Sequence, residues 1–444
     1  MGRSPGRGQG PVALLSRLPG WSLAGRLGWS MTDQALFSVT NAALSIIVAR
    51  GVTAEAFGAF AISFSVYAFL IGLQRAWITE PFTMRFADAQ PAVLRAAARH
   101  ATGAALWLGC CSGLLVMAVG LGLRGTPTGT SLLALAVSLP GLLVQDSFRA
   151  VFFSQGRARS AAANDGLGAV VQLAGAGTLV ATGHASVLLL VLTWGTANTL
   201  GALYGCLQSR FLPQPGGALR WMSGSRHLWG FMVPQYLGVM GCYQFAVLLV
   251  GVVGTAGDVG ALRSAAVLLG PLSILSSSIL AFAIPEIVRR RDRPPSFHLR
   301  AALVISGAHV LATAAWGGLL LALPYEAGQA VLGDSWTTGR SILPAAVVGQ
   351  AAVLVTVGVS TVLIGFSAAK ALLRLSFLLP PLHISLGVGG SLLFGVQGAA
   401  AGFALSACIT APFWWIYFNR FLRRMSADRA AGALGTPRGI VTST

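Results

Sequence analysis

The chain has 444 residues, of which 55% are hydrophobic and only 9% are charged. Soluble domains carry about 25% charged residues, so this composition excludes an ordinary soluble protein. The formal net charge of +18 would suit nucleic-acid binding, but that function requires a solvated basic surface, which so apolar a chain does not provide.

Twelve apolar stretches along the chain are long enough to cross a lipid bilayer as helices. The hydrocarbon core of a bilayer is about 30 Å thick, and a helix needs about 20 apolar residues to span it. The stretches cover residues 31–49, 57–79, 101–123, 131–152, 165–182, 185–207, 228–252, 260–284, 301–323, 341–364, 371–392 and 396–418. The predicted fold class is therefore an all-α integral membrane protein with about twelve transmembrane helices.

These stretches divide into two sets of six. The polar segment 208–227 between the sets contains Pro213 and Gly216, a composition typical of a flexible linker. We therefore predict an N-terminal six-helix bundle at 31–207 and a C-terminal six-helix bundle at 228–419. A basic tail precedes the first bundle at 1–30, and a second basic tail follows at 420–444.

The basic residues alternate between the two sides of the predicted membrane. Of the 30 Lys and Arg residues, 24 lie in the two tails and in the loops 80–100, 153–164, 208–227, 285–300 and 365–374. The loops on the other side hold only Arg50, Arg124 and Arg340. Because cytoplasmic loops carry the excess of positive charge, both termini are predicted to be cytoplasmic.

The sequence contains no constellation typical of an enzyme or a metal centre. All five cysteines lie inside apolar stretches, without the spacing of a metal site or a disulfide framework. No ATP-binding loop or pair of carboxylates in a large soluble loop is present either. We therefore predict a protein that is not an enzyme and that has no cofactor and no metal.

Arg75 lies in the last third of the second stretch, and Glu80 follows it. The planar guanidinium of Arg75 is well suited to bind a phosphate. Alternatively, Arg75 extends to the membrane surface or pairs with Glu80. Trp77 and Phe82 place the membrane interface beyond Arg75, which favours the binding role.

A second group of charges lies at the cytoplasmic end of the fourth stretch. Asp146 and Arg149 are spaced i,i+3, so they share a helix face and can pair. Asp165 opens the fifth stretch and is close enough to join Arg149 or Arg157 in a network. The alternative is a purely structural contact between the two helices. Arg263, one turn inside the external end of the eighth stretch, either binds an anion there or reaches the external headgroups.

Two segments, 33–85 and 143–165, resemble the polysaccharide flippases of the multidrug/oligosaccharidyl-lipid/polysaccharide (MOP) superfamily. The resembling elements are Asp33-Gln34 with Asn41, Ala49-Arg50 followed by Phe57-Gly58, Gln74-Arg75, Glu80-Pro81, Gln145-Asp146-x-x-Arg149, Gly156-Arg157 and Asn164-Asp165. The first half carries the signal, and a weaker similarity in length and number of stretches covers the rest. The positions expected to mirror Asp146 and Arg149, near 356–359, carry no charge.

This resemblance implies a MATE-like fold of two bundles and a transporter of the bacterial inner membrane, active in polysaccharide biosynthesis and export. It would flip a lipid-diphosphate-linked oligosaccharide from the inner to the outer leaflet by alternating access. The expected partners are membrane lipid, this lipid-linked sugar and a polysaccharide polymerase or glycosyltransferases, with no nucleic acid.

The site residues expected from the resemblance and the charge pattern form two groups. The substrate-binding group is Arg75, Arg149, Asn41, Gln34 and Arg263. The charge network that orients the arginines is Asp33, Glu80, Asp146 and Asp165.

Two other functions fit the same composition. One is a cation-coupled exporter of drugs or small metabolites with this fold, and the other is a non-transporting membrane component of a polysaccharide assembly complex. No acidic residue lies at the midpoint of any stretch. This pattern weighs against the cation-coupled exporter, since such a transporter needs a group that binds its proton or sodium ion.

Overall fold

The computed structural model describes residues 23–86 and 88–434, apart from the side chains of residues 23–35 and of several others within helices. All regular secondary structure in these ranges is helical. The N-terminal half comprises α1 (Leu23–Gly51), α2 (Ala54–Gln74), the π-helix η2 (Arg75–Thr79), α3 (Glu80–Phe86), α4 (Pro91–Gly122), α5 (Pro127–Ser154), α6 (Ala158–Ala181) and α7 (Val187–Ser209).

The second half begins with a short connecting helix and contains two further π-helices. Its elements are α8 (Ala218–Ser223), α9 (Arg226–Tyr236), η3 (Leu237–Gly241), α10 (Cys242–Val253), α11 (Ala256–Leu268), α12 (Gly270–Arg289), α13 (Pro295–Leu321), α14 (Tyr325–Leu332), α15 (Ser335–Leu354), α16 (Val357–Gly365), α17 (Ala369–Ser376), α18 (Leu379–Leu382), η4 (His383–Val388) and α19 (Gly389–Leu434).

Every predicted apolar stretch falls on helix. Within the described ranges, eight helices are long and apolar enough to cross a membrane by length and composition. One of the eight, α17 to α19, contains the last two predicted stretches, and it turns sharply at Gly395, whose φ is +62°. The remaining stretches coincide with α1, α6 and the pair α9–α10, so the count of twelve crossings stays a prediction.

Short turns join the helices at one end of the molecule, which we call the outer end because the arginine pattern assigns it to the outside. Here Thr53, Thr126 and Ser186 cap α2, α5 and α7, each accepting a hydrogen bond from the backbone N–H three residues on. Thr255 and Asp258 form a reciprocal capping box on α11. These caps satisfy N–H groups that would otherwise lack partners at the helix starts.

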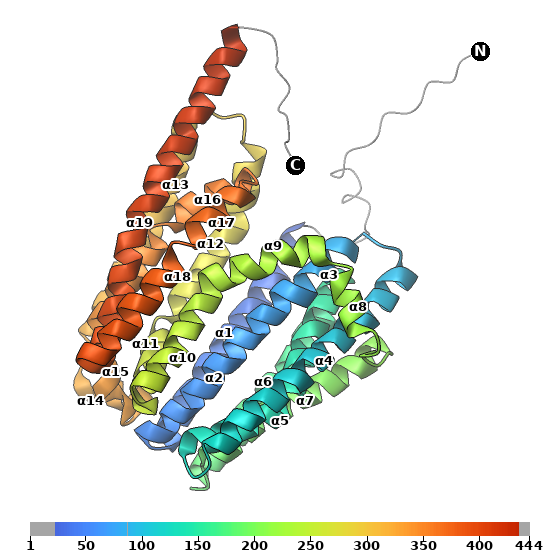
Figure 1. The fold of residues 1–444 in the computed structure, drawn as a ribbon, viewed down its shortest axis with the longest axis vertical. Helices are drawn as coiled ribbons and strands as arrows, with labels where there is room; N and C mark the ends of the chain where they lie inside the picture. The colour runs from blue at the N-terminus through green and yellow to red at the C-terminus, as the bar shows by residue number, and fades with distance from the viewer. Residues whose placement is uncertain (1–22, 87, 435–444) are drawn as a thin grey trace.

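Figure 1 shows α11–α19 on one side of the molecule and α4–α7 on the other, with α1, α2, α9 and α10 between them. Helices α1 and α2 of the first half pack against α10, α11 and α12 of the second. At the opposite, inner end, α19 projects beyond the other helices (Figure 1). The predicted C-terminal tail therefore begins as a helix, which continues to Leu434.

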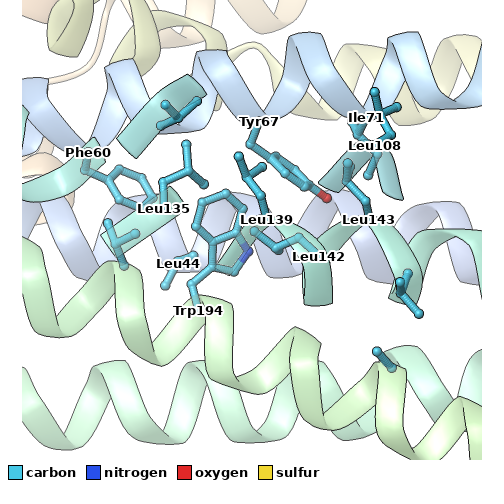
Figure 2. Packing of buried hydrophobic residues seen from close by; sticks show 14 of the residues in the cluster. Leu44, Phe60, Tyr67, Ile71, Leu108, Leu135, Leu139, Leu142, Leu143 and Trp194 are labelled. Carbon is cyan, nitrogen blue, oxygen red and sulfur yellow. The ribbon is translucent and has the colours of Figure 1, made fainter. Parts of the chain in front are cut away.

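The core of the N-terminal half lies between α2, α5 and α7. Trp194 of α7 is 2% exposed, and its ring stacks edge-on against Tyr67 at a centroid distance of 4.8 Å (Figure 2). Phe60, Leu135 and Leu139 fill the adjacent space (Figure 2). In a membrane, such packing contributes mainly through van der Waals contact, because lipid tails are as apolar as the core. This core holds α2 and α5, the two helices that carry the candidate site.

The segment predicted as a flexible linker, 208–227, packs against the first half. The N–H of Gln214 donates to the carbonyl oxygen of Arg99 at 2.9 Å. A side chain at Gly103 would collide with the backbone of Gln214, so this glycine permits the close approach of α4. The start of the second half is thus fixed to the first at the inner end.

Candidate functional site

Arg75, the first residue of η2, forms an ion pair with Asp146 of α5. The Nε atom lies 3.2 and 3.1 Å from the two carboxylate oxygens, and Nη2 lies 2.5 Å from Oδ1. The Asp146 side chain is 5% exposed, whereas that of Arg75 is 35% exposed. The carboxylate therefore anchors the guanidinium, while about a third of the Arg75 side chain as a whole stays exposed.

This pairing differs from both arrangements considered for the sequence. Asp146 does not pair with Arg149 on its own helix, and Arg75 does not pair with Glu80. The reason lies in the packing of the helices. Asp146 faces α2, whereas Arg149, one turn closer to the inner end, faces α6.

Arg149 contacts Asp165 instead, as one of the sequence alternatives expected. Its Nε lies 3.5 Å from Oδ2 of Asp165, and the two side chains are 13% and 9% exposed. The Nε2 of Gln145 donates to Oδ1 of Asp165 at 2.6 Å and to Oδ1 of Asn164 at 3.2 Å. Asn164 in turn donates to the carbonyl of Gly201 in α7 at 2.7 Å. A buried polar network thus joins α5, α6 and α7 and holds Arg149 in place.

Two adjoining pockets between the halves open next to Arg75. The smaller has a volume of about 380 Å³ and is lined by Arg75, Glu80, Asp146, Arg149 and apolar neighbours from α3, α5 and α9. The larger, of about 770 Å³, lies between α2–α3 and α9–α10. Arg75, Glu80, Met84 and Met232 line both. We call this combined space the inner pocket; the volume of each of its two parts is in the range of sites for small organic ligands.

The walls of the inner pocket are amphiphilic. Methionine side chains at 84, 232 and 240 and the ring of Phe231 provide adaptable apolar surface. Glu80 lies on the same wall as Arg75, is exposed, and forms no ion pair with any described residue. The pocket therefore presents two arginines, each paired with a carboxylate, and the exposed carboxylate of Glu80 beside flexible apolar side chains.

Asn41 lies elsewhere, inside the N-terminal half. It lines a small polar cavity of about 40 Å³ together with Tyr67, Gln145, Asp165 and Asn198, among others. The structure therefore separates Asn41 from Arg75, although the sequence assigned both to one substrate site. Asp33 and Gln34 belong to α1, but their side chains lie outside the described residues.

Arg263 of α11 lies toward the outer end and does not line the inner pocket. Its Nη2 donates to the hydroxyl of Ser45 at 2.8 Å, and its guanidinium carbon lies 3.5 Å from the ring centroid of Phe64. Both partners belong to the first half, so the side chain crosses between the halves. Neither contact was among the roles that the sequence suggested, which were anion binding and contact with the external headgroups.

Sequence reasoning missed the contribution of α9 to the pocket. Tyr236 of this helix donates its hydroxyl to the carbonyl oxygen of Phe69 at 2.8 Å, and its ring covers Gly72. Gln235 and Met232 line the pocket beside it. The polar interruption Pro234-Gln235-Tyr236 in an otherwise apolar stretch was the available signal for this wall.

No protein-family model and no curated protein matches this sequence. Solved structures do match. A multidrug resistance MATE family transporter of the MOP superfamily, in an inward-facing conformation, has a TM-score of 0.65 at 15% identity, covering 94% of this chain and 99% of that one. The lipid II flippase MurJ, in an inward closed conformation, has a TM-score of 0.63 at 11% identity, covering 88% and 87%.

A third similar structure is a MOP superfamily transporter from Pyrococcus furiosus. Its TM-score is 0.54 at 12% identity, and the match covers 90% of this chain and 95% of that one. Each of these identities is too low to carry over a substrate, but nearly the full length of each chain is matched. The chain therefore has the fold of the MOP superfamily transporters, as the sequence resemblance implied.

Proposed function

We propose that this protein is a membrane transporter that moves an anionic, lipid-linked oligosaccharide from the inner to the outer leaflet by alternating access. The observation that carries this proposal is the Arg75–Asp146 pair on the wall of the inner pocket. The pair fixes the orientation of the guanidinium, and the Arg75 side chain as a whole is 35% exposed. Arginine binds phosphate with two parallel N–H donors, so an oriented and accessible guanidinium supports recognition of a diphosphate.

The rest of the pocket fits the remaining parts of such a substrate. Gln235 and Gln244 are uncharged hydrogen-bonding groups suited to sugar hydroxyls. The methionine side chains can adapt to the apolar start of a lipid chain. With the cell interior negative, outward movement of an anion is favoured by about 2.3 kcal/mol per charge per 100 mV. The membrane potential therefore supplies a driving force for export.

A reconstituted leaflet assay tests this function. Proteoliposomes would contain a fluorescent lipid-diphosphate-linked disaccharide, and a membrane-impermeant quencher would report its transfer between leaflets. We expect transfer above protein-free vesicles, and a decrease of about tenfold or more for Arg75→Gln, since hydrogen bonds to charged groups contribute about 1.5–3 kcal/mol.

Arg340→Gln is the matched control, because Arg340 is an exposed arginine at the outer end, distant in the fold from the inner pocket. It should leave the transfer rate unchanged. Transfer by the wild type no faster than in protein-free vesicles would refute the proposed function. Unchanged transfer by Arg75→Gln would remove Arg75 from it.

A second candidate, export of a cationic amphiphile, is favoured by Glu80. The accessible carboxylate would attract an organic cation, and the methionine-lined wall would accept its apolar part. Dye-efflux measurements in the same vesicles distinguish the two candidates. Efflux of a cationic dye that is abolished in Glu80→Gln, without transfer of the anionic lipid, would favour the exporter.

A further inference from the structure

The two halves approach each other closely near the outer end, where α2 crosses α11. A side-chain carbon at Gly58 would lie 2.1 Å from the carbonyl oxygen of Ala256, and one at Gly260 would lie 3.1 Å from the Cα of Gly58. The crossing is thus backbone against backbone and depends on two glycines. Ala61, one turn deeper in α2, is fully buried among residues of α10, α11 and α19. The outer end of this interface is closed.

Arg263 lies at this closed interface and contacts the first half through its guanidinium. Its Nη2 donates to Ser45 of α1, and its charged plane lies over Phe64 of α2 at 3.5 Å. It has no carboxylate partner within the described part of the chain. The cation is therefore stabilised by a single hydroxyl and an aromatic face, and both belong to the opposite half.

One feature of this contact limits its strength. The Nε atom of Arg263 is buried and has no hydrogen-bond acceptor among the residues that the structure describes. A buried donor without a partner destabilises the state in which it occurs, and separation of the halves would let water reach it. The cation–π contact and the Ser45 hydrogen bond thus favour closure, while the unsatisfied Nε opposes it.

We propose that Arg263 is the residue that holds the outer end of the transporter closed, through a reversible contact with Ser45 and Phe64. Its Nη2 donor is satisfied in the closed state and its Nε donor is not, so the free energies of the closed and open states stay similar. Alternating access requires two states of similar free energy. This inference concerns the interface between the halves and holds whichever substrate the inner pocket binds.

The rate of cysteine modification tests the proposal. In a background without the five native cysteines, Ala61→Cys places a thiol at the closed interface, where a maleimide reaches it only when α2 separates from α10 and α11. When opening is fast compared with modification, this rate follows the equilibrium fraction of the open state. Purified protein in detergent is sufficient, so the assay does not depend on orientation in the membrane.

We expect Arg263→Gln to increase the modification rate at position 61 by about tenfold. This factor corresponds to a loss of about 1.4 kcal/mol in the free energy that favours the closed state over the open state. Ser45→Ala and Phe64→Leu should each increase it by a smaller factor. In the Arg263→Gln background, neither should have a further effect, because the shared contact is already absent.

A reporter within one half separates opening from unfolding. Ala134→Cys places a thiol in the core of the N-terminal half, where parting of the halves does not expose it. Its modification rate should stay unchanged in every variant. The proposal is overturned if Arg263→Gln leaves the rate at position 61 unchanged or lowers it. It is also overturned if the rates at positions 61 and 134 rise together.

Discussion

Arg75 and Asp146 are 71 residues apart in the sequence, yet three hydrogen bonds join their side chains. The Asp146 side chain is almost fully buried. A buried carboxylate is costly in the apolar interior unless a cation compensates it. The pair is therefore both a structural contact between η2 and α5 and the device that orients Arg75 toward the inner pocket. These two roles can be separated by mutation.

The first prediction concerns stability. Arg75→Met leaves Asp146 buried without its cation, and we expect it to lower the free energy of unfolding by about 3 kcal/mol. The double variant Arg75→Met/Asp146→Leu removes both charges and should recover most of this loss, although it should not transport. Thermal unfolding in detergent provides the measurement. A double variant as unstable as the single one would show that Asp146 does not depend on Arg75.

The second prediction concerns Glu80, which shares the pocket wall with Arg75. Its carboxylate repels an anionic ligand, so Glu80→Gln should strengthen binding of a lipid diphosphate by about tenfold, the effect of a charge about 12 Å away at an effective dielectric constant of about 20. Equilibrium binding of the labelled lipid measures this change. Glu326→Gln, at an exposed position on α14, is the control and should have no effect. Weaker binding in Glu80→Gln would show that Glu80 supports the ligand instead of repelling it.

Much of the fold could be predicted from the sequence, because hydropathy and glycine positions report local structure. The gap between the last two predicted stretches, 371–392 and 396–418, contains a turn at Gly395, where a positive φ favours glycine. The partner of Asp146 could not be predicted. The i,i+3 spacing to Arg149 is a local signal, whereas the true partner depends on how η2 packs against α5.

The π-helix at Arg75 illustrates a second limit. An extra residue in the helical turn changes the direction of every following side chain, and no residue type marks its position. A regular helix would therefore give the wrong facing for Glu80, which follows the π-helix. The position of Asn41 depends instead on how α1 packs, and Asn41 lines the small cavity inside the first half.

The third prediction concerns the contact between α9 and α2. Tyr236→Phe removes the hydrogen bond to the carbonyl of Phe69 and should lower the free energy of unfolding by about 1 kcal/mol. Gly72→Ala should have a larger effect, because the new methyl group would lie 2.2 Å from the Tyr236 ring and displace it. Gly177→Ala is the matched control, since nothing lies within 4 Å of its added carbon. Equal unfolding temperatures for the Gly72 and Gly177 variants would contradict this interpretation.

The fourth prediction uses the glycines of the outer crossing. Gly58→Ala would direct a methyl group at the backbone oxygen of Ala256, which cannot move unless α2 and α11 separate. Gly260→Ala meets the Cα of Gly58 at 3.1 Å and needs only a small shift. The modification rate of a cysteine at position 61 should therefore rise strongly in Gly58→Ala and slightly in Gly260→Ala. This order follows from the distances alone, without any charge, so it measures closure separately from Arg263. If Gly58→Ala leaves the rate unchanged, the halves do not close by direct backbone contact, and the closed state would depend on side-chain contacts alone.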